Sequence, residues 1–278
     1  MPATVAEIMS VLEKLAPESL AEEWDNVGLA VGDPGAKVTK LWVALDPLPE
    51  VVAAAVNDGA QMLLTHHPLI FTPIRNLRFN DPLADTIRLA VTSNLAVACA
   101  HTNLDRAAGG VNDVLADRLG LSGQSPLDPE MAIPACISSD SSDDLRPMGW
   151  VGELPSPMKL AELARFVRQR LDAPWVRFSG HPEAIVGIVA VCGGSGSSLL
   201  HHFFRSRATA FISGDFRYHD ARNAQARGRT LVDIGHFASE RLVVPALAQM
   251  LRDRFTKQGL TVTVKAYEEE TDPFIPVA

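Results

Sequence analysis

The chain has 278 residues, of which 47% are hydrophobic and 21% are charged, and its formal net charge is −8. This composition supports one large or two modest hydrophobic cores and excludes a disordered chain. The acidic balance disfavours non-specific nucleic-acid binding, because a negative surface repels the phosphate backbone.

The first predicted element is a helix that follows Thr4. Thr4 and Glu7 have the T-x-x-E spacing of a capping box. Ile8, Leu12 and Leu15 then lie on one side of the helix. The early acidic residues are not typical of a signal peptide, and no run approaches the roughly 20 apolar residues of a membrane helix. We therefore expect a cytoplasmic protein that does not enter a membrane.

Strands and helices alternate from here to residue 119. The patterns predict strands at residues 29–32, 38–45, 61–65 and 95–100, and helices at 47–57, 81–93 and 110–119. Strands that alternate with helices of this length indicate βαβ units, and hence an α/β fold with a parallel or mixed sheet.

The composition changes at residues 122–147. This stretch contains the acidic run SSDSSDD at 138–144 and four prolines, Pro126, Pro129, Pro134 and Pro147. It indicates a domain boundary with a solvated loop or hairpin. Beyond it the alternation resumes, with strands predicted at 149–152, 184–192, 210–213, 230–234 and 260–266 and helices at 158–171, 193–204, 218–226 and 236–255.

Histidines stand at the end of one buried strand. His66 and His67 end the strand 61–65 just before Pro68. Adjacent side chains of a regular strand point to opposite faces, but this constraint relaxes where the strand ends. Open α/β sheets bind ligands beyond the carboxyl ends of their strands, so both rings stand where a site is expected.

Two further strand ends carry matching chemistry. The motif AHTNLD follows the strand 95–100 and offers the carboxylate of Asp105, while His236 and Glu240 follow the strand 230–234 at the i, i+4 spacing of one helix face. Three imidazoles and two carboxylates exceed the needs of one four-coordinate ion and suit two divalent ions about 3.5–4 Å apart. The alternative is that each residue is structural, since a lone H-x-x-x-E is weak evidence.

Six motifs in order make the chain similar to a known family. They are EEWDNVGLAVGDP, LLTHHPLIF, AHTNLDRAAGGVND, GGSGSSLL, SGDFRYHDA and DIGHFASE. Together they resemble the Nif-three-like dinuclear metal-binding family, often labelled GTP cyclohydrolase I type 2 homologues, from about residue 4 to the C-terminal TDPF. The resemblance implies that the metal ligands are His66, His67, Asp105, His236 and Glu240.

The resemblance also implies two intertwined α/β lobes, with mixed sheets flanked by helices, and a toroidal homohexamer whose metal sites face its cavity. We divide the chain into a metal-binding lobe of residues 1–125 and 232–278 and a second lobe of residues 126–231. Longer relatives carry an inserted domain in mid-chain, which this sequence lacks.

Other residues leave alternatives open. Either His101 or His219 is expected to transfer protons, with a polar residue at the surface of a helix start as the alternative for His219. Asp25 of the WDNVG motif is either a partner of the metal ligands or part of a turn. The GGSGSS stretch at 193–198 is expected to form a tight strand-to-helix turn, with a phosphate cradle as the weaker alternative. Cys99, Cys136 and Cys192 lack CxxC spacing and are expected to be reduced thiols.

The expected function is a metal-dependent hydrolase, with a GTP cyclohydrolase that opens the purine ring of a nucleotide by means of a metal-activated water as the specific form. A phosphoesterase would use the same residues, and a non-enzymatic metal-binding or regulatory hexamer is the other alternative. The ligand types suit two divalent ions among Zn, Fe, Mn, Co and Ni without selecting one.

Overall fold

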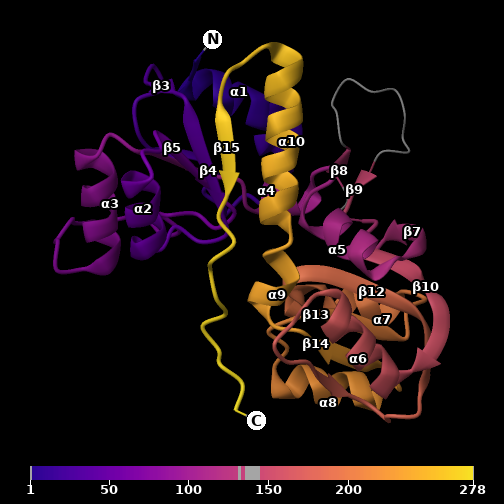
Figure 1. Ribbon diagram of the computed structural model, residues 1–278. Helices are drawn as coiled ribbons and strands as arrows, with labels where there is room; N and C mark the ends of the chain where they lie inside the picture. Colours follow the sequence, from indigo (N-terminus) through magenta and orange to yellow (C-terminus); the bar gives the residue numbers. More distant parts are fainter. Residues whose placement is uncertain (1, 131–132, 135–144, 278) are drawn as a thin grey trace. The chain divides into compact units, whose positions relative to one another are not determined.

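The computed structural model describes residues 2–130, 133–134 and 145–277 and divides into two compact units (Figure 1). Unit 1 comprises Met1–Gly110 and Val243–Glu270, and unit 2 comprises Val111–Leu242 and Thr271–Ala278. The chain therefore leaves the first unit and later returns to it, so the two α/β lobes are intertwined along the sequence as predicted.

The boundaries differ from those predicted at 125/126 and 231/232. Residues 111–125 and 232–242 belong to unit 2, because β7 (Ser122–Pro126) and β14 (Thr230–Asp233) are hydrogen-bonded into its sheet. The helices α5 (Val111–Leu119) and α9 (His236–Glu240) pack on β12 (Ile185–Ser195) of that same sheet.

Unit 1 is built on a five-stranded mixed sheet with the order β15-β4-β5-β6-β2. β2 is antiparallel to β6, and the other neighbouring pairs are parallel. The strands are β15 (Thr263–Ala266), β4 (Lys40–Ala44), β5 (Met62–Thr65), β6 (Ala96–Cys99) and β2 (Gly28–Val31). The remaining elements are the short pair β1 (Ala3–Thr4) and β3 (Lys37–Val38), the helices α1 (Val5–Leu15), α2 (Pro49–Asn57), α3 (Pro82–Thr92), α4 (Thr102–Arg106) and α10 (Val243–Gln258), and the 3-10 turn η1 (Glu18–Leu20).

Helices cover both faces of this sheet. On one face Trp42, Leu63 and Val97 pack against α2 and α3. Leu41 and Leu64, which alternate with these residues along the strands, are also buried, and α10 packs against β4 and β15. A sheet buried on both faces explains why its strands appear in the sequence as continuous apolar runs.

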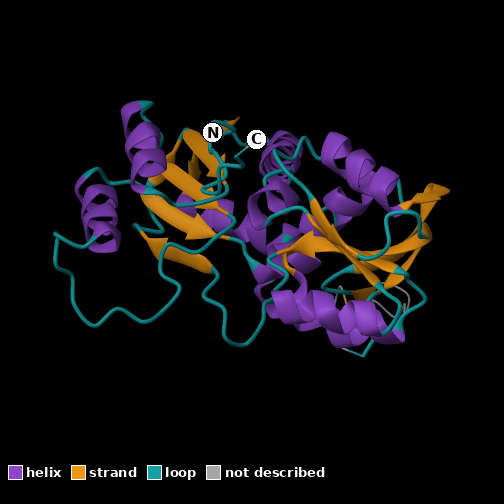
Figure 2. Cartoon of the chain, turned by 90° about the horizontal axis from the view of Figure 1, so that it is seen from below, coloured by secondary structure: helices purple, strands orange, loops and turns teal. Residues whose placement is uncertain are grey.

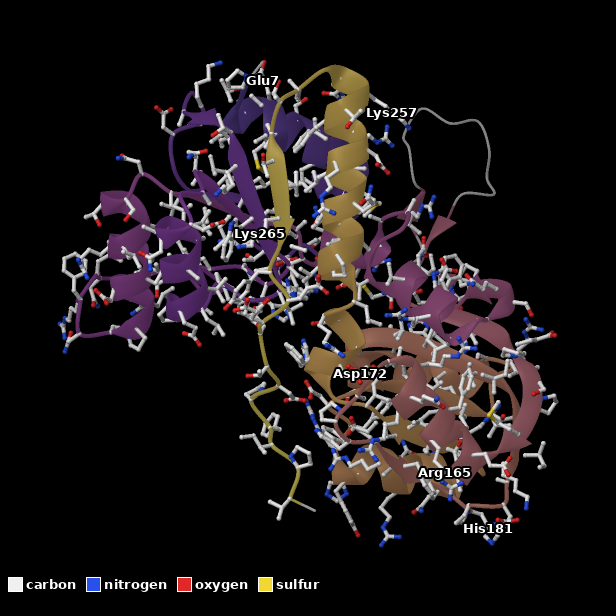
Figure 3. The ribbon with its side chains drawn as sticks, in the orientation of Figure 1. Glu7, Arg165, Asp172, His181, Lys257 and Lys265 are labelled. Carbon is white, nitrogen blue, oxygen red and sulfur yellow. The ribbon has the colours of Figure 1, made fainter. Side chains whose placement is uncertain are left out.

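The ends of the elements in unit 1 follow from local sequence. The predicted capping box is confirmed: Thr4 Oγ1 accepts a hydrogen bond of 3.1 Å from the Glu7 N–H, and the Glu7 carboxylate accepts one of 2.6 Å from the Thr4 N–H. At the sheet edge, β15 carries Lys265, labelled in Figure 3, whose ammonium lies 4.3 Å from the centroid of the Trp42 ring. A lysine on an edge strand discourages pairing with a further strand.

Unit 2 is built on a six-stranded mixed sheet with the order β11-β14-β13-β12-β10-β7. β12, β13 and β14 are parallel, and the other pairs are antiparallel. The strands not yet given are β11 (Arg177–Ser179), β13 (Ala210–Gly214) and β10 (Trp150–Lys159). The other elements are α6 (Leu160–Arg170), α7 (Leu200–Arg205), α8 (Tyr218–Ala226), the 3-10 turn η2 (Gly196–Leu199) and the short pair β8 (Ile133–Pro134) and β9 (Leu145–Arg146).

The second sheet also lies between two layers of helices (Figure 2). On one face Val191 of β12 belongs to a cluster with Leu115 of α5 and Leu163 of α6. On the other face Phe211 of β13 clusters with Phe203 of α7 and Ala224 of α8. The predicted α/β class, with mixed sheets flanked by helices, is thus confirmed.

Two local expectations need correction, and a third concerns residues that the structure does not describe. The single helix predicted at 236–255 is two helices, α9 and α10, separated at residues 241–242. Pro245 explains the break, because its missing N–H cannot bond to the carbonyl of Arg241 as a continuous helix requires. The short helix α4 was not predicted. The acidic run 138–144 lies outside the described residues. Among the helices that the structure describes, none is long and apolar enough to cross a membrane.

Candidate metal centre

Three histidines of unit 1 meet beyond the carboxyl ends of β5 and β6. The His66 and His67 N–H groups continue the parallel pairing past the end of β5, donating to Ala44 O and Leu45 O. The two rings have centroids 4.9 Å apart, and the His101 ring, which follows β6, lies 5.2 and 5.6 Å from them. One ring nitrogen from each histidine lies within 4.8 Å of those of the other two, which is close enough to hold a metal ion.

Each of these rings is oriented through its Nδ1 atom. His66 Nδ1 lies 3.0 Å from Ala100 O, His67 Nδ1 lies 2.7 Å from Asp46 Oδ1, and His101 Nδ1 lies 2.9 Å from an oxygen of Asp25. A carbonyl or carboxylate oxygen only accepts, so the hydrogen belongs on Nδ1, and in the neutral form of the ring the lone pair is then on Nε2. Metal-binding histidines have this arrangement, in which an acceptor fixes the tautomer and orients the ring.

The helix α4 returns Asp105 to the same cluster. Its first turn places the Asp105 N–H 3.0 Å from His101 O. The Asp105 carboxylate then lies 3.6 Å from His66 Nε2, and the side chain of His66 is only 1% exposed. A lone pair that faces a carboxylate in a buried place repels it unless a cation or a proton lies between them.

Asp25 of the WDNVG motif is a partner of this cluster. Besides His101, its carboxylate accepts hydrogen bonds from the Thr102 N–H, at 3.0 Å, and from the Thr102 hydroxyl. Burial alone would raise the pKa of Asp25, but the hydrogen bonds from His101 and Thr102 outweigh it and hold that pKa well below its usual range. The structure thus places an ionised Asp25 beside His101, whose ring it orients, while its role toward the predicted metal ligands stays a prediction.

The other predicted ligands, His236 and Glu240, lie in unit 2. They stand at the two ends of α9, which follows β14, and His236 Nε2 lies 3.0 Å from Glu240 Oε2. The Glu240 side chain is 5% exposed and that of His236 is 40% exposed. His236 Nδ1 lies 2.8 Å from an oxygen of Asp215. All three predicted histidine ligands therefore have their Nδ1 atom on an oxygen acceptor.

The GGSGSS stretch makes room for this pair. β12 runs through Ser195, and Gly194 has a φ of +62°. A Cβ added at Gly194 would lie 2.3 Å from Glu240 Oε1 and 3.3 Å from His236 Nε2. The Gly194 N–H donates to Ser239 Oγ at 2.8 Å, which fixes the approach. The expected turn into a helix follows at η2. With the Glu240 carboxylate so close to Gly194, the structure gives no support to a phosphate cradle there.

The distances suit a divalent ion. Two donors that each lie about 2.0–2.2 Å from one ion, at angles of about 90–109°, are roughly 3.0–3.5 Å apart. The His236–Glu240 separation of 3.0 Å falls in this interval, and the His66–Asp105 separation of 3.6 Å is close to it. The nitrogen and oxygen donors thus fit the implied metal within each unit.

The two residues predicted to transfer protons differ in setting. His101 belongs to the unit 1 cluster and is held by Asp25. His219 is exposed at the start of α8 in unit 2, with its ring 5.3 Å from that of Tyr218. Its role stays a prediction.

Sequence reasoning missed Asp46 and Gly194. Asp46 follows the apolar strand β4, as His66 follows β5, so a polar residue after a neighbouring parallel strand was the available signal. Gly194 lies in the GGSGSS stretch, but nothing in that sequence indicated that it would contact a predicted metal ligand.

Neither of the two described cysteines belongs to the clusters of possible metal ligands. Cys99 and Cys192 are buried, and Cys136 lies outside the described residues. Burial, followed by the charge of Asp25, raises the pKa of Cys99 to about 12. A thiol with this pKa is protonated at neutral pH and is not a nucleophile.

Comparison with known proteins identifies the family. Residues 3–273 match the family model described as Duf34/NIF3 (NGG1p interacting factor 3), so the chain belongs to this family. A Streptomyces coelicolor protein named GTP cyclohydrolase 1 type 2 homolog is 34% identical over 97% of this chain and 93% of its own length. The alignment with a Bacillus subtilis protein of the same name covers 363 positions at 25% identity, so that relative carries additional residues.

Solved structures agree with the family assignment. A Staphylococcus aureus hypothetical protein, SA1388, has a TM-score of 0.90 and 29% identity, with all of both chains covered. A Bacillus cereus protein related to NIF3 has a TM-score of 0.89 and 26% identity, with 99% of each chain covered. The family and the fold that the sequence motifs predicted are therefore both confirmed.

Proposed function

We propose that this chain is a metal-dependent hydrolase that acts on a nucleotide such as GTP. In this proposal it binds two divalent ions through His66, His67 and Asp105 of unit 1 and His236 and Glu240 of unit 2. The observation that carries the proposal is the common orientation of His66, His67 and His236, each with Nδ1 on an oxygen acceptor. In His66 and His236 the Nε2 atom faces the carboxylate of another predicted ligand. The name GTP cyclohydrolase 1 type 2 homolog, given to several relatives, supports the nucleotide class.

Structural histidines do not require this arrangement. A ring that only fills space has no need of a carboxylate on Nδ1, and a ring in a plain ion pair needs no second acceptor on Nε2. His236 has both, with Asp215 on one nitrogen and Glu240 on the other. Two carboxylates on one imidazole favour a positive charge at Nε2, supplied by a cation or by a proton on the ring.

The proposed chemistry divides the work among the chain's residues. When bound, a divalent ion supplies Lewis acidity, which polarises a substrate oxygen and lowers the pKa of water to about 7. His101 accepts a proton at Nε2, and the ionised Asp25 on its Nδ1 stabilises the imidazolium that results. Opening of a purine imidazole ring requires water to attack C8 and a proton to reach the departing ring nitrogen, which leaves C8 as a formamide. A second water hydrolyses the formamide and releases formate, with a proton passed to the amine that departs. His101 is the proposed carrier of the proton to the ring nitrogen, and His219 is the second candidate.

The experiment measures formate release from GTP by the purified full chain, loaded in turn with Zn, Fe, Mn, Co or Ni. His67→Ala is expected to abolish the activity. His201→Ala, which removes an exposed histidine of α7, is the matched control and is expected to retain it. Phosphate release from a panel of esters, without formate, would replace the cyclohydrolase with a phosphoesterase. If the metal-loaded chain releases neither formate nor phosphate, the remaining alternative is a non-enzymatic metal-binding protein.

The proposed assembly is a homohexamer with its metal sites facing a central cavity. Light scattering coupled to gel filtration measures it directly. The expected particle contains six chains of 30.0 kDa each. A monomer or dimer across the micromolar range would contradict this part of the proposal.

A further inference from the structure

Unit 2 has a cavity that none of the proposed metal ligands lines. Its volume is about 240 Å³, and it lies among the edge strand β11, the end of β14 and the start of α8. Its apolar wall is formed by Phe178, Phe216, Tyr218 and Leu231, and its charged lining residues are Arg177, Arg217 and Asp233. Apolar walls with a few polar groups are typical of small-molecule sites.

The aromatic wall is held in place before any ligand arrives. Phe216 is 7% exposed, and its ring lies 5.3 Å from that of the buried Phe211. Tyr218 is 67% exposed, yet its hydroxyl accepts a hydrogen bond of 3.0 Å from Arg222 Nε, and the Arg222 guanidinium lies 5.2 Å from the ring centroid. A fixed, exposed aromatic ring provides a face for another flat ring at little cost in entropy.

The two cations at this cavity differ in what they contact. The Arg177 guanidinium already forms an ion pair, because its Nε and Nη2 atoms lie 2.9 and 2.7 Å from Asp233 Oδ2. Its Nη2 also donates a hydrogen bond to Phe216 O. The guanidinium of Arg217 forms no ion pair with a carboxylate within residues 2–130 and 145–277. Its hydrogen bonds within these residues are made by the backbone: its N–H donates to Asp220 Oδ2 at 2.9 Å, and its carbonyl accepts from the Ala221 N–H at 3.2 Å. Arg217 thus gives a positive rim to an otherwise acidic protein.

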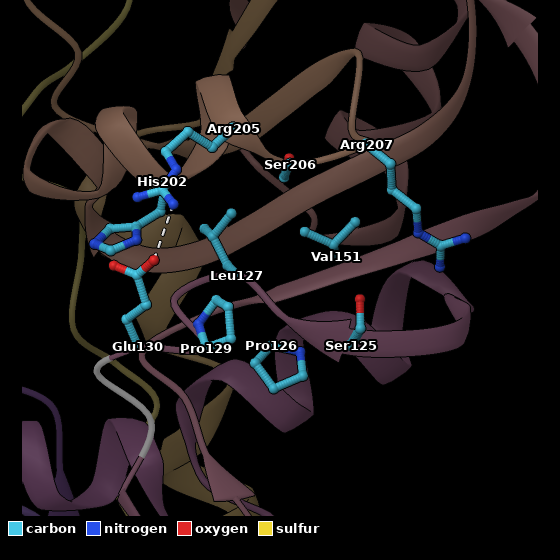
Figure 4. A pocket seen from close by; sticks show the side chains of 10 residues that line it. All are labelled: Ser125, Pro126, Leu127, Pro129, Glu130, Val151, His202, Arg205, Ser206 and Arg207. Carbon is cyan, nitrogen blue, oxygen red and sulfur yellow. Dashed lines mark hydrogen bonds and ion pairs between the residues drawn. The ribbon is translucent and has the colours of Figure 1, made fainter.

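The cavity shown in Figure 4 provides a contrast. Its volume is about 220 Å³, and it too has arginines at its rim. Arg205 pairs there with Glu130 at 2.9 Å, as Figure 4 shows. Arg207 pairs with Glu153, which does not line the cavity, at 3.2 Å. An anion bound by either arginine would compete with that carboxylate, whereas the Arg217 guanidinium has no carboxylate partner among the described residues.

We propose that the cavity beside Tyr218 binds a planar aromatic anion of the nucleotide class. The ring packs on the aromatic wall and the phosphate pairs with Arg217, which can bind it in a bidentate manner. The volume is below the roughly 300–1,000 Å³ of pockets for drug-sized ligands, so a single ring system fills it. The loop that forms the wall begins at Asp215, the partner of His236, which links this site physically to the candidate metal ligands.

The test is calorimetric titration of the full chain with GMP, guanosine and ribose 5-phosphate. It is done in EDTA, so that a failure of the proposed metal chemistry cannot affect the result. GMP is expected to bind, and removal of either the phosphate or the base is expected to weaken binding about tenfold or more. Failure of GMP to bind overturns the proposal.

Two variants locate the binding. Arg217→Gln is expected to weaken GMP binding about tenfold and to leave guanosine unchanged. Arg165→Gln, on the exposed face of α6 (Figure 3), removes the same charge elsewhere in unit 2 and is expected to change neither. Equal effects of the two substitutions on GMP, or loss of guanosine binding in Arg217→Gln, overturn the proposal. Thermal unfolding confirms that both variants are folded.

Discussion

Gly194 allows a direct test of how the candidate metal ligands of unit 2 are positioned. The substitution Gly194→Ala adds one methyl group at a residue whose φ is +62°. That methyl carbon would lie 2.3 Å from Glu240 Oε1 and 3.3 Å from His236 Nε2. The backbone cannot easily retreat, because the Gly194 N–H donates to Ser239 and its carbonyl accepts from Ser213.

Two costs follow. A non-glycine residue in the left-handed region costs roughly 1–2 kcal/mol, which lowers the melting temperature by roughly 2–4 °C per kcal/mol in a domain of this size. In addition, a carbon and an oxygen in contact are about 3.2–3.5 Å apart, so the Glu240 carboxylate must move by about 1 Å. A displaced supporting or ligating group lowers metal affinity by roughly 10–100-fold.

Gly228→Ala separates the two costs. Gly228 lies in unit 2 with a φ of +65°, and an added Cβ there would have nothing within 4 Å. The control is therefore expected to lose the same backbone stability and no metal affinity. The assays are thermal unfolding and competition with a zinc chelator. If Gly194→Ala and Gly228→Ala bind zinc equally well, Gly194 does not make room for a metal ligand and the reasoning is refuted.

Three further predictions concern unit 1. Asp46→Asn is expected to lower metal affinity by roughly 10–100-fold in a chelator competition, since Asp46 orients His67, and an equal loss in the exposed control Asp85→Asn would contradict this. Leu63→Ala, in the buried cluster beneath α2 and α3, is expected to cost about 2–5 kcal/mol in guanidinium unfolding, and a loss below about 1 kcal/mol would be inconsistent with that packing. The hydrogen bond from the Thr4 N–H lowers the pKa of Glu7 from its ordinary value of 4.5. The stabilisation by the capping box is therefore present above pH 4.5 and is lost as the pH falls through the lowered pKa. An NMR titration that gives Glu7 a pKa of 4.5 or higher would rule this out.

Much of the fold could be predicted from the sequence, because strands and helix ends leave local patterns. The strands of unit 1 are buried on both faces, so they stand out as apolar runs, and the residues that begin and end helices use short-range chemistry such as the capping box at Thr4. The segment at Tyr218–Ala226 was predicted with its observed ends. Motifs of this local kind need no knowledge of the tertiary structure.

What the sequence could not supply depends on tertiary contacts. Asp46 reaches His67 only because β4 and β5 are adjacent and parallel, and residues 111–125 join unit 2 only because β7 pairs with β10. The sequence predicted His66, His67, Asp105, His236 and Glu240 as ligands, and this assignment stays a prediction. It did not predict the acceptors on the Nδ1 atoms of the three histidines, which are Ala100 O, Asp46 and Asp215.

The most direct test of the metal proposal is a crystal structure of the metal-loaded chain with anomalous scattering data. The account predicts two ions per chain, coordinated by the Nε2 atoms of His66, His67 and His236, with each Nδ1 atom still hydrogen-bonded to its oxygen acceptor. Coordination through Nδ1, or ions bound away from these residues, would contradict it.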